Sequence, residues 1–377
     1  MTTNAIWRLN ASTVLHAALA PGAPADLPRT PDVLVVGGGI VGLATAAACV
    51  RAGLGEVLVV ERDELAAGAS GGAAGLLTPE AHAWTDSAAF VALARRSLEH
   101  WRTLDREWDG ALGIEPLEWL AILPGEIPPG TDLGPTATVL DADGARALEP
   151  ELGDVVGALH LHDQARVDPL RAAVAFAARG GTVATGVEML GVSVRGGRVT
   201  SVGTTAGDIH PGAVVFATGL APPVPGLAVA QEWVKGHLLA TEPAPFRLRT
   251  QLATLECLAL QLPGGEIVAG GTLDEGDDDP EVQPDVVARI RDELAGLVPR
   301  TRDLATRTAW CCFRPATMDR EPVIDRVPGL EDAWVTCGHF RTGILMAPGT
   351  GDALARWIAS GERPPEVEAF SVARADP

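Results

Sequence analysis

Three short runs of apolar residues have the uninterrupted pattern of strands buried on both faces. They are residues 33–36, residues 57–60 within the predicted strand 56–60, and residues 213–217. Such strands are typical of a parallel sheet that helices cover on both sides. Between the first two runs, the Ala-rich stretch 43–52 predicts a helix that ends at Gly53, a favourable residue just past a helix end. Strand, helix and strand then form one βαβ unit, so the pattern predicts an α/β domain.

Helical periodicity predicts three further helices. Residues 85–108 have large apolar side chains at helical spacing, with Thr85 or Asp86 as the expected cap. The buried stripe of this helix is expected to be Phe90, Leu93, Leu98, Trp101 and Leu104. Asp168 and Pro169 are a helix-start signal, and residues 284–297 predict another helix.

Shorter apolar runs separated by Gly and Pro fill residues 109–165 and 230–310, which predicts a second, antiparallel sheet. Residues 189–194 and 198–204 predict a hairpin that turns at Gly196 and Gly197. The first 31 residues are an arm that either packs on the body through Trp7, Leu9, Val14 and Leu15 or is disordered.

Composition narrows the class of protein. The 377 residues carry a net charge of −20 and a single lysine, which argues against a nucleic-acid partner, because such binding needs clustered basic residues. The five cysteines form no C-x-x-C pair, so we expect the reducing cytoplasm. No apolar run reaches the ~20 residues of a membrane span, so no membrane partner is expected. The length suggests two domains, and a homo-oligomer is compatible with it.

A glycine-rich turn directly follows the first predicted strand. Gly37, Gly39 and Gly42 have the spacing G-x-G-x-x-G, and Glu61 ends the second strand about 20 residues on, where a carboxylate binds a ribose hydroxyl. The helix that begins at the turn directs its free N–H groups and positive dipole end towards phosphates. The sequence therefore predicts a bound dinucleotide with an ADP moiety.

Three blocks of sequence carry a family resemblance. They are residues 35–42 with Glu61 and Arg62, residues 68–76 (G-A-S-G-G-A-A-G-L), and residues 338–348 (G-H-F-R-T-G-I-L-M-A-P). From residue 32 to about 358, the chain resembles the flavoprotein amine oxidases typified by D-amino acid oxidase, glycine oxidase and sarcosine oxidase. The last block, with residues 313–319 and 322–325, is most similar to glycine oxidase.

The resemblance implies FAD as the cofactor and an α/β fold class. A glutathione-reductase-like FAD-binding Rossmann domain would be joined to a second, antiparallel-sheet (α+β) substrate domain, both discontinuous in sequence. With residues 1–31 as the N-terminal arm, the FAD-binding domain would comprise residues 32–108, 155–229 and 311–377. Residues 109–154 and 230–310 would form the substrate-binding domain.

The resemblance also assigns contacts to FAD. Three glycines would meet the pyrophosphate, Glu61 the ribose, the backbone of Val187 the adenine, and the 338–345 block the isoalloxazine ring. The full set is Gly37, Gly39, Ile40, Val41, Gly42, Glu61, Arg62, Ser70, Ala74, Gly75, Leu76, Val187, Thr218, Gly219, Gly338, Arg341, Thr342, Gly343, Ile344 and Leu345.

Substrate recognition is expected to depend on a carboxylate anchor. Arg314 matches the glycine-oxidase arginine with this role, and a guanidinium provides two charge-assisted hydrogen bonds to a carboxylate. Arg341 matches a second pocket arginine. The chain has no tyrosine, and Leu258 occupies the position where these oxidases usually place one. Glu256 shares the strand face of Leu258 by period-two alternation, and His339 is a further candidate for contact with substrate or flavin.

Two alternatives stay open. Cys312 falls where sarcosine oxidase carries the cysteine bonded to its flavin, so the residue is either a covalent flavin ligand or a buried thiol. His160 and His162 share one face of a predicted strand, but no third metal ligand is evident, and we expect no metal.

The resemblance implies an FAD-dependent oxidase of a small amino acid or N-substituted amino acid. A hydride would pass from Cα to the flavin, the imine would hydrolyse to a 2-oxo acid, and O2 would be reduced to H2O2. Because about Val268 occupies the position of the lysine that sarcosine oxidase uses for oxygen, a D-amino acid or hydroxyproline dehydrogenase is the alternative. A flavin subunit of a larger electron-transfer complex is a third reading.

Overall fold

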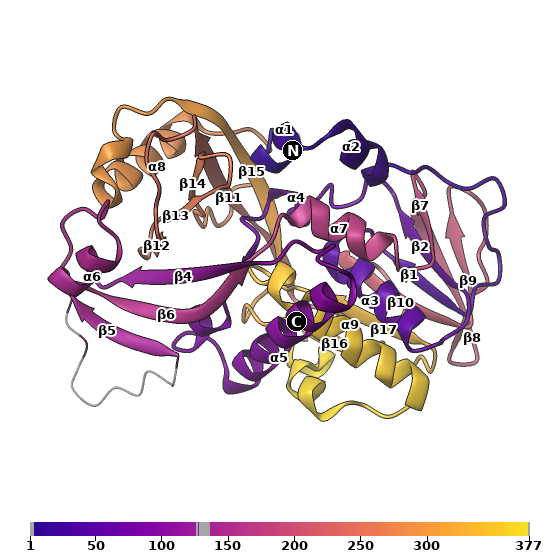
Figure 1. The fold of residues 1–377 in the computed structure, drawn as a ribbon. Helices are drawn as coiled ribbons and strands as arrows, with labels where there is room; N and C mark the ends of the chain where they lie inside the picture. The colour runs from indigo at the N-terminus through magenta and orange to yellow at the C-terminus, as the bar shows by residue number, and fades with distance from the viewer. Residues whose placement is uncertain (1–3, 126, 128–135, 376–377) are drawn as a thin grey trace.

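Two large sheets organise the chain, one at each end of the molecule (Figure 1). The structure is a computed structural model, and it describes residues 4–125, 127 and 136–375. The order of strands in the first sheet is β16-β17-β10-β1-β2-β7, and the second has the order β15-β11-β14-β13-β12-β4-β6-β3 with β5 paired to β6.

The six-stranded sheet is parallel except for β16, which runs antiparallel to β17. Its strands are β1 (Val33–Val36), β2 (Val57–Glu61), β7 (Thr182–Thr185), β10 (Ala213–Gly219), β16 (Val323–Arg326) and β17 (Ala333–Cys337). The apolar runs thus form the centre of a doubly covered sheet, and the predicted fold class is confirmed.

Helices and a hairpin cover the two faces of this sheet. The helices are α3 (Ile40–Arg51), α5 (Ala88–Glu107), α7 (Pro169–Ala177) and α9 (Gly343–Ser360), and they contribute to one apolar core. On the other face, a second core includes side chains of the hairpin β8 (Met189–Arg195) and β9 (Arg198–Thr204). This hairpin turns at Gly196 and Gly197 as predicted, both at positive φ.

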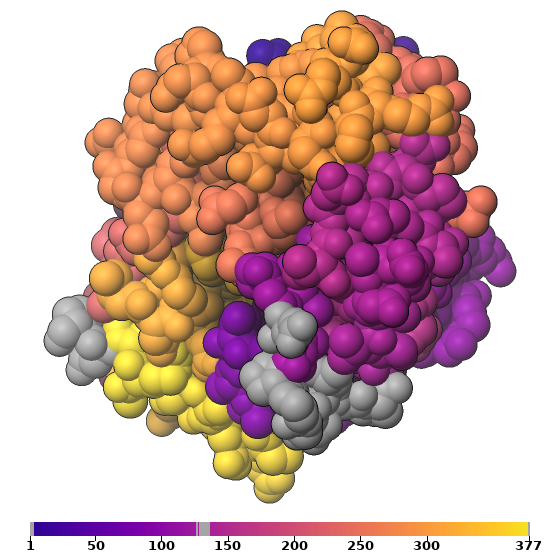
Figure 2. Space-filling view, turned by 90° about the vertical axis from the view of Figure 1, so that its left-hand side faces the viewer, coloured from indigo at the N-terminus to yellow at the C-terminus, as the bar shows by residue number. Residues whose placement is uncertain are grey.

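The nine-stranded sheet is mostly antiparallel, and α6 (Ala142–Leu148) and α8 (Pro284–Leu297) contribute to the core on one of its faces. Its strands are β3 (Leu76–Leu77), β4 (Glu115–Ile122), β5 (Ala137–Asp141), β6 (Gly157–Arg166), β11 (Gln231–Thr241), β12 (Gln251–Ala253), β13 (Leu258–Gln261), β14 (Ile267–Gly270) and β15 (Thr306–Thr317). Figure 2 shows the end of the molecule where its magenta and orange segments form the surface.

Three strands of the nine-stranded sheet lie wholly or partly in segments predicted to belong to the FAD-binding domain. β3 and β6 fall in the segments 32–108 and 155–229, which were assigned to the FAD-binding domain, yet both belong to the nine-stranded sheet. β15 continues through the predicted boundary at residue 311 and pairs with β11 along its whole length. Strand pairing between distant segments, rather than local composition, decides where these residues belong. The domain boundaries remain predictions.

Side-chain caps mark where α5 and α7 begin. Ser87 caps α5 by accepting a hydrogen bond from the N–H of Phe90, so the expected caps Thr85 and Asp86 are wrong. The predicted stripe of α5 is buried. Asp168 caps α7 as predicted, through the N–H groups of Leu170 and Arg171. None of the helices in the described ranges combines the length and apolar composition needed to cross a bilayer.

The N-terminal arm packs on the body. It contains α1 (Ile6–Asn10) and α2 (Thr13–Leu19), and the indole Nε1 of Trp7 donates to the carbonyl of Ala73 at 2.8 Å. Leu15 packs against the same core. Leu9 and Val14, however, are 47% and 79% exposed, so their expected strapping role is wrong. Short helical turns elsewhere are α4 (Ala69–Gly72), η1 (Pro79–His82), η2 (Pro299–Thr301), η3 (Pro365–Phe370) and η4 (Val372–Arg374).

α9 contains Pro348, which has no N–H to donate to the carbonyl of Ile344 one turn earlier. Two side chains of α5 satisfy the backbone groups at this point. The indole of Trp101 donates to the carbonyls of Ile344 and Leu345, both at 3.1 Å. The Ser97 hydroxyl donates to the carbonyl of Leu345 at 2.6 Å and accepts from the N–H of Gly349 at 3.0 Å. The start of α9 is therefore held in place by α5.

Replacing Ser97 with alanine is expected to lower the free energy of unfolding by about 1–3 kcal/mol. The change removes the acceptor of the buried Gly349 N–H and one of the two side-chain donors to the Leu345 carbonyl, and a buried group left unpaired keeps its cost of burial. Equilibrium denaturation with urea measures the effect. Glu99→Ala, an exposed position on the same helix, is the control and should change stability by less than about 0.5 kcal/mol. Equal stability of the two variants would contradict the role of Ser97.

Candidate active site

One cavity of about 2140 Å³ is lined by residues of both sheets and of the N-terminal arm. Ligand pockets for single small molecules measure about 300–1,000 Å³, so this cavity has room for a dinucleotide and a substrate together. Its lining runs from the glycine-rich turn after β1, past β2 and α4, to β15 and the first turn of α9.

The glycine-rich turn shows why three glycines are needed. A Cβ on Gly37 would lie 2.4 Å from the carbonyl oxygen of Ala217, and one on Gly42 would lie 2.1 Å from that of Gly37. These two glycines allow the turn and the packing of α3. A Cβ on Gly39 would meet only the hydroxyl of Ser70, at 3.5 Å, and would project at the cavity wall. Gly39 therefore leaves space for a ligand rather than for the protein.

Glu61 lies at the end of β2 on the wall of this cavity. Its Oε2 accepts from the N–H of Gly38 at 2.6 Å and its Oε1 from the N–H of Asp63 at 2.9 Å. The N–H of Val187 donates to the backbone carbonyl of Glu61 at 2.8 Å, so the segment that follows β7 lies beside Glu61 at the cavity wall. A fixed carboxylate beside a glycine turn and a helix N-terminus fits the ribose and pyrophosphate of FAD.

Most of the predicted site residues line the cavity. They are Gly37, Gly39, Ile40, Val41, Glu61, Arg62, Ser70, Ala74, Gly75, Leu76, Val187, Thr218, Gly219, Leu258, Cys312, Arg314, His339, Arg341, Thr342, Gly343, Ile344 and Leu345. Gly42, Gly338 and Glu256 do not. Gly338 is needed for packing, since its φ is +68° and a Cβ would lie 2.6 Å from the Thr317 methyl.

The expected position of Glu256 is wrong. The alternation that placed it beside Leu258 requires a continuous strand, but β13 begins only at Leu258. Glu256 lies in the turn between β12 and β13, where its N–H donates to the hydroxyl of Thr254, and it is exposed. Leu258 itself is half-buried and lines the cavity as predicted.

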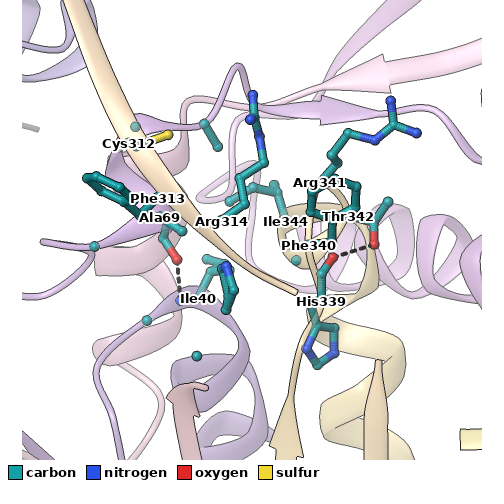
Figure 3. Close-up of a pocket in the computed structure, with 18 of the residues that line it drawn as sticks. Ile40, Ala69, Cys312, Phe313, Arg314, His339, Phe340, Arg341, Thr342 and Ile344 are labelled. Atoms are coloured by element: carbon teal, nitrogen blue, oxygen red, sulfur yellow. Dashed lines mark hydrogen bonds between the residues drawn. The ribbon is translucent and has the colours of Figure 1, made fainter. Parts of the chain in front are cut away.

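Arg314 and Arg341 bring two positive charges to the cavity. In Figure 3 both side chains extend in the same direction, from β15 and from the loop before α9. Arg314 donates from Nη1 to the carbonyl of Thr272 at 2.8 Å and to that of Lys235 at 3.3 Å. Burial lowers the pKa of Arg314, and the charge of Arg341 lowers it further. Among the described residues, neither arginine forms an ion pair with a carboxylate.

The position of Arg314 depends on Gly236 of β11, which pairs with Cys312 and lies diagonally across the ladder from Arg314. A Cβ on Gly236 would lie 2.0 Å from Nη1 of Arg314 and 2.4 Å from the carbonyl oxygen of Thr272. The guanidinium therefore occupies space that only a glycine leaves free.

Gly236→Ala is expected to displace the Arg314 guanidinium and to lower kcat/KM by about 10-fold or more, since a misplaced binding group costs catalytic efficiency. The FAD content should stay unchanged, because Gly236 does not line the cavity. Steady-state kinetics and the flavin absorbance of the purified variant measure both. Unchanged kcat/KM in a variant with full FAD would contradict the proposed packing.

His339 lines the cavity with part of the residue, but its imidazole points away from the two arginines in Figure 3. The ring Nε2 lies 3.3 Å from the hydroxyl of Thr350 in α9. Burial lowers the pKa of His339 to about 4, so the ring is neutral near pH 7. The side chain thus packs the start of α9, and contact of its ring with a substrate is not supported.

Cys312 lies on β15 at the cavity wall, 4% exposed. Burial raises the pKa of its thiol, which keeps the sulfur protonated at neutral pH. That Cys312 is a covalent flavin ligand and that it is a buried thiol therefore both stay predictions.

Sequence reasoning missed several residues near the site. Asp277 and Asp278, in the acidic run of residues 274–279, line the cavity. Lys235 forms an ion pair with Asp277 at 3.0 Å, and this contact lowers the pKa of the Asp277 carboxyl. The acidic run was visible in the sequence, but its fold towards the cavity was not. Glu118 is a third ligand-type group beside His160 and His162, where none was expected.

The fold and cavity together define a dinucleotide-binding enzyme of the α/β class. The sequence profile of the FAD dependent oxidoreductase family (DAO) matches residues 32–357, so the chain belongs to this family. FAD is accordingly its cofactor, and the chain is an FAD-dependent oxidoreductase.

Individual relatives support this assignment. Glycine oxidase of Bacillus licheniformis is 29% identical over 371 residues, which cover 91% of this chain and 97% of the relative. The crystal structure of glycine oxidase from Geobacillus kaustophilus is 26% identical, with a TM-score of 0.81 over 92% of this chain and 99% of that one. The bifunctional protein ThiO/ThiG of a Synechocystis strain is 29% identical over 367 residues, and the chain spans only 54% of its length. The expected resemblance to glycine oxidases is confirmed.

Proposed function

We propose that this chain is an FAD-dependent oxidase of a small amino acid or N-substituted amino acid. The observation that carries the proposal is Arg314, a guanidinium on the cavity wall that no described carboxylate neutralises. Keeping an unpaired charge away from bulk water is costly unless a ligand supplies the counter-charge. A substrate carboxylate is the matching group, and relatives named glycine oxidase act on an amino acid.

Arg314 and Arg341 have different tasks in this proposal. The two backbone carbonyls that accept from Nη1 of Arg314 hold its planar fork in one orientation. The other guanidinium donors, Nε and Nη2, would bind the substrate carboxylate in a bidentate manner. Arg341 is exposed, and its ring neighbour is Phe340, with the guanidinium 5.5 Å from the ring centroid. It adds positive potential and screens the substrate charge.

The protein binds and orients, and the cofactor supplies the electron chemistry. When bound, FAD accepts the hydride of the substrate Cα–H. Arg314 fixes the carboxylate, so the Cα hydrogen is held in one direction, which lowers the entropic part of the barrier. Two described histidines line the cavity: the neutral ring of His339 lies 3.3 Å from the Thr350 hydroxyl, and Nδ1 of His82 lies 3.1 Å from the Asp86 carboxylate. We assign neither of them the role of an obligatory base. The substrate amine is therefore expected to react in its neutral form.

Leu258 favours substrates with apolar character. It lies beside Gly271, one residue before the Thr272 carbonyl that binds Arg314. A leucine cannot donate the hydrogen bond that a tyrosine would give a carboxylate. An N-methyl group or a small apolar side chain would gain from this contact, whereas glycine would gain nothing.

Peroxide formation separates an oxidase from the dehydrogenase alternative. The purified holoenzyme is mixed with small amino and N-alkyl amino acids in air, and oxygen uptake and H2O2 are followed together. An oxidase should give H2O2 in proportion to the oxygen consumed. Turnover that appears only with an added dye or quinone acceptor would support the dehydrogenase and overturn the oxidase. In either case, the role of Arg314 is tested separately by its own variants.

A further inference from the structure

A cluster of three ligand-type side chains lies on the nine-stranded sheet, outside the cavity. Glu118 comes from β4, and His160 and His162 come from β6. The ligand atoms all lie within 4.8 Å of one another. The carboxylate Oε2 of Glu118 is 2.5 Å from Nε2 of His160 and 3.7 Å from Nδ1 of His162. Two imidazoles and one carboxylate thus converge on a single point.

The strand geometry explains why the three side chains meet. His160 and His162 are two residues apart on β6, so they share a face. Between the pairs Trp119–Leu161 and Leu117–Gln164, β4 advances by two residues and β6 by three, which is a β-bulge. Asp163, at the bulge, has a φ of +62°. Bulges redirect side chains, and this one places Glu118 opposite His162 and Asp163.

Contacts around the cluster hold the bulge and one imidazole in place. Arg102 of α5 donates to both carboxylate oxygens of Asp163, at 2.9 and 2.8 Å, and to its carbonyl at 2.7 Å. Thr138 of β5 has its hydroxyl 3.0 Å from Nε2 of His162. A hydrogen bond at Nε2 leaves Nδ1, the nitrogen nearer Glu118, free to bind an ion. An oxygen partner on the second ring nitrogen is what metal-binding histidines usually have.

The cluster is separate from the redox cavity. Trp119 and Leu161, next to Glu118 and to both histidines in sequence, line the cavity from the opposite face of the same strands. None of the three ligand-type residues lines it. On the cluster face, Glu118 is 48% exposed and His162 is 42% exposed, so an ion can reach them from solvent.

We propose that Glu118, His160 and His162 bind one Zn²⁺ ion. Imidazole nitrogen and carboxylate oxygen suit Zn²⁺, which takes four ligands in a tetrahedron at about 2.0–2.2 Å. Ligand atoms around such an ion are more than 3 Å apart, so binding replaces the 2.5 Å hydrogen bond between Glu118 and His160 with two bonds to the metal. Water takes the fourth position. The ion would tie β4 to β6 beside the bulge.

The test uses untagged holoenzyme and ZnCl2 alone. Isothermal titration should show one Zn²⁺ per chain, and the midpoint of thermal unfolding should rise with added Zn²⁺. Glu118→Gln, His160→Gln and His162→Gln should each weaken binding by about 100-fold or more, and Thr138→Val by about 10- to 100-fold through loss of the oriented ring. His16→Gln, an exposed histidine on α2, is the control and should bind as the wild type does.

Each outcome decides the matter. Flavin absorbance and the unfolding midpoint without metal show whether a variant has folded. Folded Gln variants that bind Zn²⁺ as tightly as the wild type would overturn the proposal, as would a wild-type protein that binds no Zn²⁺. In those cases the cluster is only a hydrogen-bonded Glu–His pair. A metal site requires that Thr138→Val lose less Zn²⁺ affinity than the three ligand variants do, and that His16→Gln keep the Zn²⁺ affinity of the wild type.

Discussion

Arg314→Leu is expected to lower kcat/KM for the amino-acid substrate by about 30- to 5,000-fold. Removing one partner of a desolvated charge pair costs about 2–5 kcal/mol, which corresponds to this range. The leucine removes a guanidinium that donates to the Thr272 carbonyl and that no carboxylate among the described residues neutralises at the cavity wall. Most of the loss should appear as a higher KM, with a lower kcat where the carboxylate no longer orients Cα. Stopped-flow reduction of the flavin measures both terms.

Two arginine variants serve as controls for this result. Arg314→Lys keeps the charge but loses the planar fork, so its kcat/KM should lie between those of the wild type and the leucine variant. Arg291 also donates to backbone carbonyls, those of Arg302 and Leu304, but does not line the cavity. Arg291→Leu should therefore leave kcat/KM unchanged. An Arg314→Leu enzyme that is reduced with unchanged substrate affinity would refute the carboxylate anchor.

Gly39→Ala is expected to weaken FAD binding by about 5- to 150-fold without unfolding the apoprotein. The added methyl group meets only the Ser70 hydroxyl, at 3.5 Å, within the protein, but it stands where the pyrophosphate must approach the backbone. An extra methylene in a filled site costs about 1–3 kcal/mol, which gives this range. Titration of the apoprotein with FAD, followed by flavin fluorescence, measures the affinity.

Two other glycines separate ligand contact from packing. Gly42→Ala places its Cβ 2.1 Å from the carbonyl oxygen of Gly37, so it should destabilise the apoprotein itself. Gly191→Ala, on β8, meets no atom within 4 Å and should change neither property. If Gly39→Ala lowers the stability of the apoprotein as much as Gly42→Ala does, then Gly39 is required by the fold rather than by the cofactor.

The sequence predicted those features whose causes are local. The run 33–36 is apolar throughout because β1 is buried between two layers, and Asp168 followed by Pro169 begins α7 because both residues suit a helix start. The helix predicted over 284–297 has the bounds observed for α8. The glycine spacing and Glu61 predicted a dinucleotide cofactor, and Gly37, Gly39 and Glu61 line one cavity, since turn, carboxylate and helix lie within 30 residues of chain.

Predictions that extended a local rule past its limit were wrong. Period-two alternation placed Glu256 with Leu258, but the strand begins only at Leu258 and alternation has no meaning in the turn before it. Ser87 caps α5 although Thr85 and Asp86 are also capping residues, because only one of three adjacent candidates can meet the free N–H groups.

Features that depend on distant segments were out of reach. Gly236 is required by Arg314, 78 residues later, and nothing in the surrounding sequence marks it. Glu118 reaches His160 and His162 only through the pairing of β4 with the bulged β6. Trp101 was predicted only as part of the buried stripe of α5 and Ser97 was not singled out, yet both side chains bond backbone groups beside Pro348. Such pairings become visible only when the fold brings the segments together.

Anaerobic titration of the bound flavin tests the central claim most directly. Small amino acids and N-methyl amino acids are each compared with the amine that lacks the carboxylate but is otherwise the same, and the loss of the oxidised flavin band is recorded. The account predicts that at least one carboxylate-bearing compound bleaches the flavin and that its amine partner does so far more weakly, with the difference abolished in Arg314→Leu. Bleaching by the amines at equal concentration and rate would contradict it.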